Sequence, residues 1–119
     1  MLDALLSRIR FTRTYVRKSS MTMGNEYKIL ISYNGHWAHF TFHDNHENKS
    51  TLRDWLYCLV LDMNAYEFSR DEYDFMRSYG YMDTDIKKAR KAYRECEKTA
   101  EKLHRIFTEA ELDILSQIE

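Results

Sequence analysis

The sequence is short of the residues that interrupt or cross-link a chain: its 119 residues include no proline, three glycines and two cysteines. With no proline, no low-complexity tract and no internal repeat there is no obvious linker, and a chain of this length has the size of one domain. Three isolated glycines do not form a glycine-rich phosphate loop. No apolar run approaches the roughly 20 residues that span a bilayer. We therefore expect one domain, residues 1–119, that does not enter a membrane.

The two cysteines indicate a reducing compartment. Cys58 and Cys96 lie in predicted helices on apolar faces, where a free thiol behaves as a small hydrophobic side chain. This setting favours a reduced pair over a disulfide. The first ten residues also lack a secretory pattern, because their apolar stretch is short and arginines follow it. We expect a protein of the cytoplasm.

Charge is distributed unevenly along the chain. Residues 1–43 carry six basic and two acidic side chains, a net of +4, whereas residues 44–119 carry 12 basic and 17 acidic side chains, a net of −5. A domain that binds nucleic acid through bulk electrostatics is usually strongly basic. The formal net charge of −1 leaves only a local patch for such a role.

The strongest local signal is a β-hairpin between Tyr27 and His43. Two alternating segments flank Asn34-Gly35, the dipeptide most typical of a two-residue hairpin turn. Such a turn fixes the register and predicts one largely apolar, buried face, made of Tyr27, Ile29, Ile31, Tyr33, His36, Ala38, Phe40 and Phe42. Residues 9–17 alternate in the same way and predict a further strand, with loops expected at residues 18–25 and 44–50.

The remainder of the chain has helical periodicity. Helix starts are indicated by three capping boxes: Thr51 with Asp54, Ser69 with Glu72, and Thr108 with Glu111. The first helix is expected to run from Leu52 to about Glu67, the second to end at Gly80, and the longest to open at Asp83 or Thr84. Together these elements predict an α+β fold, in which a three-stranded antiparallel sheet (hairpin plus N-terminal strand, residues 9–43) packs against three to four helices (residues 51–118).

The acidic segment 62–85 is the first candidate for binding a partner. It holds seven acidic side chains against two arginines, a net of −5. Its candidate contact residues are Asp71, Asp74, Asp83 and Asp85. An acidic surface can occupy a nucleic-acid channel on another protein by presenting charge where phosphates would lie. The same acids also fit the structural role of complementing helix dipoles.

Trp37 is the second candidate. On the predicted solvent face of the hairpin it forms an amphipathic patch with Leu30 and His39, and we take Trp37 and His39 as its binding residues. Exposed patches of this kind mark interaction sites or are covered by another element. The alternative here is that the N-terminal segment Leu2–Leu6 folds over that face.

A basic surface provides an alternative role in nucleic-acid binding. It would combine strand arginines with a stripe along the longest helix, namely Arg10, Arg13, Arg17, Lys87, Lys91, Arg94 and Lys98. Acidic residues are interleaved along that helix, so an ordinary solvated, partly ion-paired face is the competing interpretation. An exposed stripe and an open sheet edge also both allow an oligomer.

Evidence for catalysis is sparse. Four of the five histidines, His36, His39, His43 and His46, fall within eleven residues. On a strand, His39 and His43 are about 13 Å apart, too far to share one metal ion without a bulge. A metal-dependent activity at these histidines is a third hypothesis. No Gly-x-Ser-x-Gly or His-Glu-x-x-His motif occurs. We expect no catalytic residue, metal or cofactor.

Several motifs, in order, resemble a family of small proteins carried by phages, prophages and integrative elements of bacteria. The matching pieces cover about residues 9–118. They are Phe11-Thr-x-x-Tyr15-Val, Tyr27-Lys-Ile-Leu-Ile-Ser-Tyr-Asn-Gly35, Phe40-Thr-Phe-His-Asp44, Leu56-Tyr-Cys-Leu-Val-Leu-Asp62, Phe75-Met-x-x-Tyr-Gly-Tyr81 with Asp83 and Asp85, Lys88-Ala-x-Lys-x-Tyr93 and Leu103-x-x-Ile-Phe107-Thr-x-x-Glu111. This chain departs from the family pattern in its shorter 44–50 loop.

The resemblance implies a mobile-element origin and supplies no catalytic residues. Small non-enzymatic phage proteins of mixed charge resemble inhibitors of host defence, including anti-CRISPR proteins, and this step is an analogy. The leading hypothesis is therefore a non-enzymatic binding protein in the cytoplasm of a bacterial host. It would inhibit a host defence complex, with a Cas effector as the first candidate, by protein–protein binding. The alternative is a small nucleic-acid-binding accessory protein of a mobile element.

Overall fold

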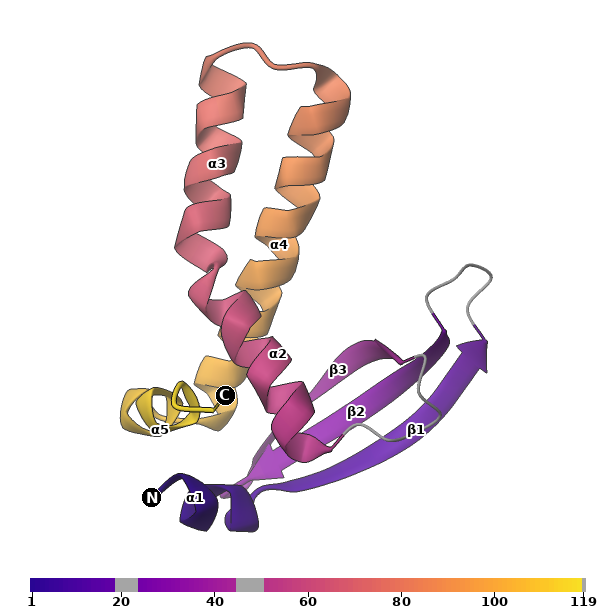
Figure 1. Cartoon of the computed structure of the whole chain (residues 1–119), viewed down its shortest axis with the longest axis vertical. Helices are drawn as coiled ribbons and strands as arrows, with labels where there is room; N and C mark the ends of the chain where they lie inside the picture. Colours follow the sequence, from indigo (N-terminus) through magenta and orange to yellow (C-terminus); the bar gives the residue numbers. More distant parts are fainter. Residues whose placement is uncertain (19–23, 45–50, 119) are drawn as a thin grey trace.

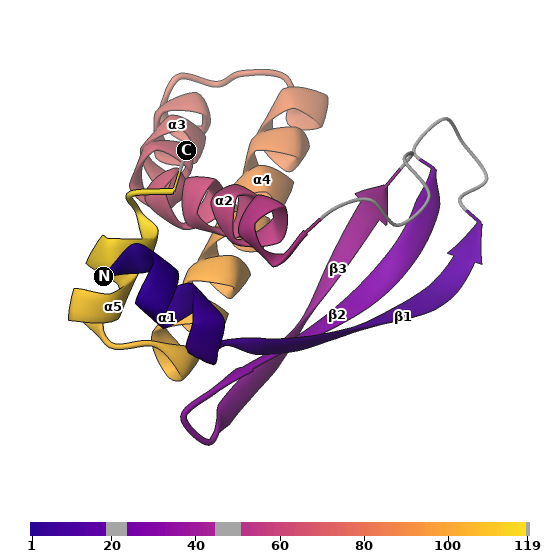
Figure 2. The ribbon, with the colours of Figure 1, turned by 60° about the horizontal axis from the view of Figure 1, so that its bottom comes forward.

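The computed structural model describes residues 1–18, 24–44 and 51–118, and it confirms an α+β fold. Helices and strands follow one another as α1 (Leu2–Arg8), β1 (Arg10–Lys18), β2 (Asn25–Tyr33), β3 (His36–Asp44), α2 (Leu52–Asn64), α3 (Tyr66–Ser78), α4 (Asp83–Ile106) and α5 (Glu109–Leu115). The three strands form one antiparallel sheet in the order β1-β2-β3, and the helices lie on one side of it (Figures 1 and 2).

The hairpin has the predicted register. Tyr33 pairs with His36, Ile31 with Ala38, Ile29 with Phe40 and Tyr27 with Phe42. The backbone explains why: Asn34 has φ 51° and Gly35 has φ 81°, the left-handed pair that a type I′ turn requires. Because the register is correct, the predicted face is the buried one along most of its length, with Ile29 and Ile31 both fully buried, whereas His36 beside the turn is exposed.

β1 has the same length as the predicted strand but begins and ends one residue later, and it is exposed. It pairs with β2 from Arg10 to Lys18, so the connection is shorter than the expected 18–25 loop, whose residues 19–23 lie outside the described residues. The register shifts between Tyr15 and Arg17, so that Val16 is an extra residue in the strand. All nine residues of β1 are exposed, because the helices cover the part of the sheet nearer β2 and β3. At the end of the hairpin, Asp44 still belongs to β3, and the rest of the predicted 44–50 loop also lies outside the described residues.

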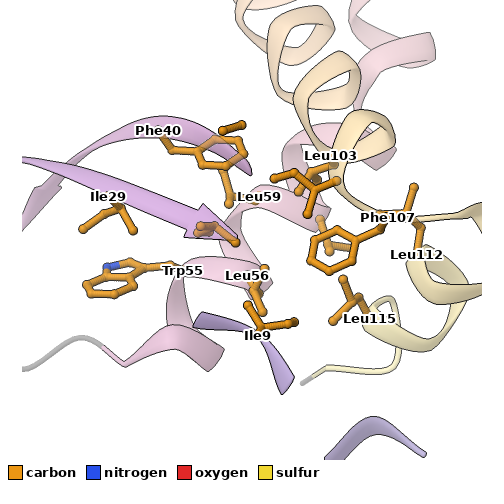
Figure 3. Packing of buried hydrophobic residues seen from close by; sticks show 14 of the residues in the cluster. Ile9, Ile29, Phe40, Trp55, Leu56, Leu59, Leu103, Phe107, Leu112 and Leu115 are labelled. Atoms are coloured by element: carbon orange, nitrogen blue, oxygen red, sulfur yellow. The ribbon is translucent and has the colours of Figure 1, made fainter. Parts of the chain in front are cut away.

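The core lies between the sheet and the lower ends of the helices. Figure 3 shows Ile29 and Phe40 of the sheet facing Trp55, Leu56 and Leu59 of α2, with Leu103 closing the cluster from α4. Further buried side chains come from the ends of the chain, namely Leu5, Ile9, Phe107, Leu112, Leu115 and Ile118. One cluster therefore joins the sheet, α1, α2, α5 and the C-terminal part of α4.

Two of the three predicted capping boxes are present. The Thr51 hydroxyl accepts a hydrogen bond from the Asp54 amide at 3.3 Å, and Thr108 caps α5 in the same way. The third was wrong: Ser69 lies inside α3, and the chain passes from α2 to α3 at Ala65, whose backbone stays close to helical. α4 begins at Asp83, as predicted, and the residue before it, Met82, is an N-cap that makes no side-chain hydrogen bond.

The N-terminal segment corrects a further expectation. Leu2–Leu6 is part of helix α1 and packs with α5, since Leu5 is buried in the core and Leu2 and Leu6 lie against it. It does not cover the outer face of the sheet, where Trp37 remains 59% exposed. The prediction for Cys58 was also wrong, because helical periodicity placed it on an apolar face, whereas it is exposed on α2. Cys96 is buried, as predicted, and both thiols are free.

α3 and the N-terminal part of α4 form a helical arm that projects from the rest of the molecule (Figure 1). The two helices run antiparallel and contact each other along the arm. α3 has no fully buried residue, so the arm has a thin interface and not a core of its own. The turn that joins the two helices lies at the end of the molecule farthest from α1 and from the β2–β3 turn (Figure 1).

Candidate functional site

The end of the arm gathers three of the four predicted acidic contact residues. Asp74 lies in the last turns of α3, and Asp83 and Asp85 lie in the first turn of α4. Because the helices are antiparallel, these carboxylates lie at the same end of the arm. Asp71 lies further down α3, where its Oδ1 is 3.4 Å from Nε of Arg70. All four side chains are exposed.

Aromatic side chains lie at the same end of the arm as these acids. The ring of Phe75 lies 4.5 Å from that of Tyr79 and 6.0 Å from that of Tyr81 between centroids. Tyr79 is 72% exposed and Met82 is 74% exposed, so the cluster faces solvent. We call this surface the arm tip, formed by Phe75, Tyr79, Tyr81 and Met82 with Asp74, Asp83 and Asp85.

Helical periodicity predicted Phe75 and Tyr79 as helix residues but did not identify them as a surface cluster. The available signal was their spacing from Phe68: steps of seven and four residues put Phe68, Phe75 and Tyr79 on one line of α3. The side of α3 that meets α4 carries Ser69, Tyr73 and Met76, which are all partly buried. The line of Phe68, Phe75 and Tyr79 lies away from that side. No helix or strand among the described residues covers it, and Phe68 is 71% exposed.

Gly80 determines the shape of the arm tip. Its φ of 67° ends α3 in a left-handed residue, after which the Tyr81 amide donates to the Met76 carbonyl at 3.2 Å. This is the hydrogen bond of a Schellman motif, and it confirms the predicted helix stop. The reversal places the Tyr81 ring against Phe75 and directs the chain into α4.

A tyrosine–carboxylate cluster fixes the base of the arm. The hydroxyls of Tyr66 and Tyr93 donate to Oε2 of Glu97 at 3.2 and 2.9 Å, and Arg94 donates to Oε1 at 3.1 Å. The hydrogen bond from Tyr93 is the largest cause that lowers the pKa of Glu97, and the same bond is the largest cause that raises the pKa of Tyr93 to about 12. Of these bonds, the one from Tyr66 connects α3 to α4, where the apolar contact is thin.

The hollows along the arm are shallow. One of about 330 Å³ opens between α3 and α4 beside the arm tip, and it is lined by Ser69, Glu72, Met76, Tyr81, Asp85, Lys88, Ala89 and Ala92. A second, of about 410 Å³, lies at the base of the arm and includes Tyr66, Glu97 and His104. Open hollows of this kind suit contact with the surface of a macromolecule better than enclosure of a small ligand.

Trp37 and His39 lie far from the arm tip. They follow the turn between β2 and β3, at the other end of the long axis from the α3–α4 turn (Figure 1). Their rings are 5.4 Å apart in an edge-to-face arrangement. The structure therefore separates the predicted partner-binding residues into two surfaces.

The predicted basic surface also divides. Arg13 lies on the inner side of β1, 5.6 Å from the Trp55 ring, whereas Arg17 faces outward and pairs with Glu26 at 3.2 Å. Arg10 lies at an outward register position, opposite Ser32. The helical members Lys87, Lys91, Arg94 and Lys98 are exposed on α4. β1 is the strand farthest from β3, which α4 contacts, so the two groups do not form one patch.

Histidines and thiols form no metal-binding cluster in the part of the chain that the structure describes. Nε2 of His43 lies 3.6 Å from Glu26, and no cluster of three His, Cys, Asp or Glu side chains could hold a metal ion there; His46 is outside that part. Burial raises the pKa of both Cys58 and Cys96, which opposes formation of a nucleophilic thiolate.

Comparison with family models, with curated proteins and with solved structures finds no match for this chain. The resemblance to mobile-element proteins therefore stays a prediction. None of the helices in residues 1–18, 24–44 and 51–118 has the length and apolar character needed to cross a membrane.

Proposed function

We propose that this chain is a non-enzymatic binding protein that engages a partner protein through the arm tip. The observation that supports this function is the exposed ring cluster of Phe75, Tyr79 and Tyr81 at the end of a projecting helical arm, beside three carboxylates. Buried aromatic anchors dominate the energy of protein interfaces, and a rim of charge selects the partner. The arm presents both kinds of group together.

The exposed apolar area is large enough for an interface. Taking roughly 200 Å² for each aromatic side chain, the exposed fractions of Phe68, Phe75, Tyr79 and Tyr81 correspond to about 500 Å². A standard interface buries about 800 Å² on each partner, a little over half of it apolar. The partner would need an apolar pocket for the rings and basic side chains opposite Asp74, Asp83 and Asp85.

A nucleic-acid-binding channel on a host complex has this chemistry. Such channels combine lysines and arginines with aromatic side chains, and acidic groups at the arm tip would occupy positions that phosphates otherwise take. The resemblance to proteins of phages and integrative elements supports a host defence complex as the partner. We propose a Cas effector in the bacterial cytoplasm as the first candidate, and inhibition by blocking its nucleic-acid channel.

The test is capture of partners from host lysate on the tagged protein, with and without nuclease, followed by mass spectrometry and by binding of the purified complex. The variant Phe75→Ser/Tyr79→Ser should reduce affinity at least tenfold, because two anchors are lost. Asp74→Asn/Asp83→Asn/Asp85→Asn should reduce affinity and its dependence on salt. Tyr57→Ser, an exposed ring on α2, is the matched control and should bind normally.

Two results would contradict this function. One is recovery of a nuclease-resistant complex whose affinity is the same for the Phe75/Tyr79 variant and the wild type. The other is that no protein partner survives nuclease treatment. Circular dichroism of each variant establishes that a loss of binding is not a loss of fold.

A further inference from the structure

The outer face of the sheet carries a second surface, which the arm tip does not use. From the strand register, outward positions form three rows: Arg10, Ser32 and Trp37; Thr12, Leu30 and His39; Thr14, Lys28 and Thr41. The helices lie on the other side of the sheet (Figure 2), so no described element covers these rows. Neighbouring strands are about 4.8 Å apart. Arg10 and Trp37 are therefore about 10 Å apart across the sheet.

Two aromatic rings stand on this open face. Trp37 is 59% exposed, and its ring meets that of His39 edge to face at 5.4 Å. An exposed indole on a sheet surface offers a flat ring on which another planar group can stack. Trp55, in contrast, is 4% exposed in the core, so the two tryptophans of the chain have opposite environments.

Cations of α4 adjoin this face at the β3 edge, because α4 lies on the other side of the sheet. Nζ of Lys102 donates to the carbonyl of His39 at 2.7 Å and lies 5.4 Å from the Phe40 ring, which joins α4 to β3. Lys98 and Arg105 are four residues before and three residues after Lys102, so they lie on the same side of the helix. Burial chiefly lowers the pKa of Lys102, and the charges of Lys98, Arg105 and Lys28 lower it further, because these cations are close together.

Negative charge on this face is already paired. Among the outward positions of the described strand residues, the only acidic side chain is Glu26, which lies 3.2 Å from Arg17 and 3.6 Å from His43. The basic side chains near Trp37 and His39 therefore keep a local positive field, although the whole chain has a net charge of −1. The arm tip carries charge of the opposite sign.

We propose that this face, formed by Trp37, His39, Arg10 and Lys28, binds a single strand of nucleic acid. Aromatic rings on an open surface stack unpaired bases, and cations beside them contact the phosphates. A duplex presents no unstacked base to Trp37, so the single strand is the better fit. This site is independent of the arm tip, and together the two would bring a nucleic acid and a protein onto one molecule.

The test uses fluorescein-labelled oligo-dT, oligo-U and a duplex of equal length, with affinity measured by anisotropy at several salt concentrations. Single strands should bind more tightly than the duplex. Trp37→Ala should weaken binding about 5- to 150-fold, the range for loss of one stacked base. Lys28→Gln and Arg10→Gln should each reduce the salt slope by about 0.7. Preference for oligo-U or oligo-dT distinguishes RNA from DNA, and either supports the site.

Tryptophan fluorescence provides a direct second measurement. A bound oligonucleotide should quench the exposed Trp37 and protect it from iodide, and the change should vanish in Trp37→Phe while the buried Trp55 still emits. Tyr79→Ala and Arg77→Gln at the arm are matched controls that should leave oligonucleotide affinity unchanged, so failure of this site is separable from failure of the arm tip. Absence of binding at low salt, equal affinity for the duplex, or an unchanged affinity of Trp37→Ala would overturn the proposal.

Discussion

Replacing Gly80 with alanine tests whether the left-handed turn holds the arm tip together. The φ of Gly80 is 67°, and a Cβ added there would meet no atom within 4 Å. The cost is therefore one of backbone conformation alone, about 1–2 kcal/mol for a residue with a side chain. Alanine also restricts the unfolded chain, which stabilises the folded state by about 0.4–1 kcal/mol. The net loss should be about 1 kcal/mol.

This loss should be visible at a single amide. The Tyr81 amide, which donates to the Met76 carbonyl at 3.2 Å, should exchange with solvent about fivefold faster in Gly80→Ala. The Phe107 amide, bonded to the Leu103 carbonyl at 2.9 Å in the core, is the internal control and should keep its rate. Gly80→Asn should have a smaller effect, because asparagine adopts the left-handed region more readily.

Either of two results would refute the reasoning. Unchanged exchange at Tyr81 would mean that Gly80 does not need a positive φ. An equal increase at Phe107 would mean that the turn opens only when the whole domain unfolds. In the first case the arrangement of the Phe75, Tyr79 and Tyr81 rings would also lose its explanation.

Three further perturbations probe the core, a cap and the base of the arm. Leu103→Ala should lower the free energy of unfolding by about 3 kcal/mol or more, measured in urea, because Leu103 is fully buried and its removal leaves a cavity; a loss below about 1 kcal/mol would contradict its place in the core. Thr108→Ala should cost about 1 kcal/mol in the same assay, since its hydroxyl accepts from the Glu111 amide at 3.2 Å, and an unchanged stability would argue against the cap. The bond from Tyr93 lowers the pKa of Glu97, so its contribution to stability is present above the ordinary value of 4.5 and is lost as the pH falls through the lowered pKa. In Glu97→Gln the free energy of unfolding should therefore change less between about pH 6 and about pH 3 than in the wild type.

The sheet could be predicted from the sequence because its signals are local. Asn34-Gly35 determines a turn, the turn determines a register, and period-two alternation then decides which face is buried. The boxes at Thr51 and Thr108 are equally local, since each needs only a hydroxyl and a carboxylate three residues apart.

The helical part was predicted less well where neighbours decide the outcome. Ser69 and Glu72 have the spacing of a cap, but α3 begins earlier because the chain continues from α2 through Ala65 in a nearly helical conformation. There Ser69 meets α4, with its hydroxyl 3.9 Å from the Cys96 sulfur. Helix α1 was missed because a segment of seven residues has little periodicity, and Leu5 is held in place by the core it joins.

The candidate sites depended still more on tertiary structure. Charge counting found Asp74, Asp83 and Asp85, but only the antiparallel arm shows that they share one end. Lys28 and Lys102 are 74 positions apart in the sequence, and no local pattern indicates that they approach the same strand. The arginines of β1 and the lysines of α4 looked like one basic surface because a sequence does not show that β2 and β3 lie between them.

α4 also has a mechanical consequence. Its 24 residues form one uninterrupted helix of about 36 Å, which begins at the arm tip and ends in the core beside β3. The other side of the arm, α3, is separated from α2 by a break at Ala65. α4 is therefore the stiffer of the two arm helices, and Ala65 is the natural hinge. A force applied at the arm tip would therefore be transmitted along α4 to Lys102 and to β3, the strand that Lys102 contacts. Pulling on the tip should strain the sheet before it bends α4.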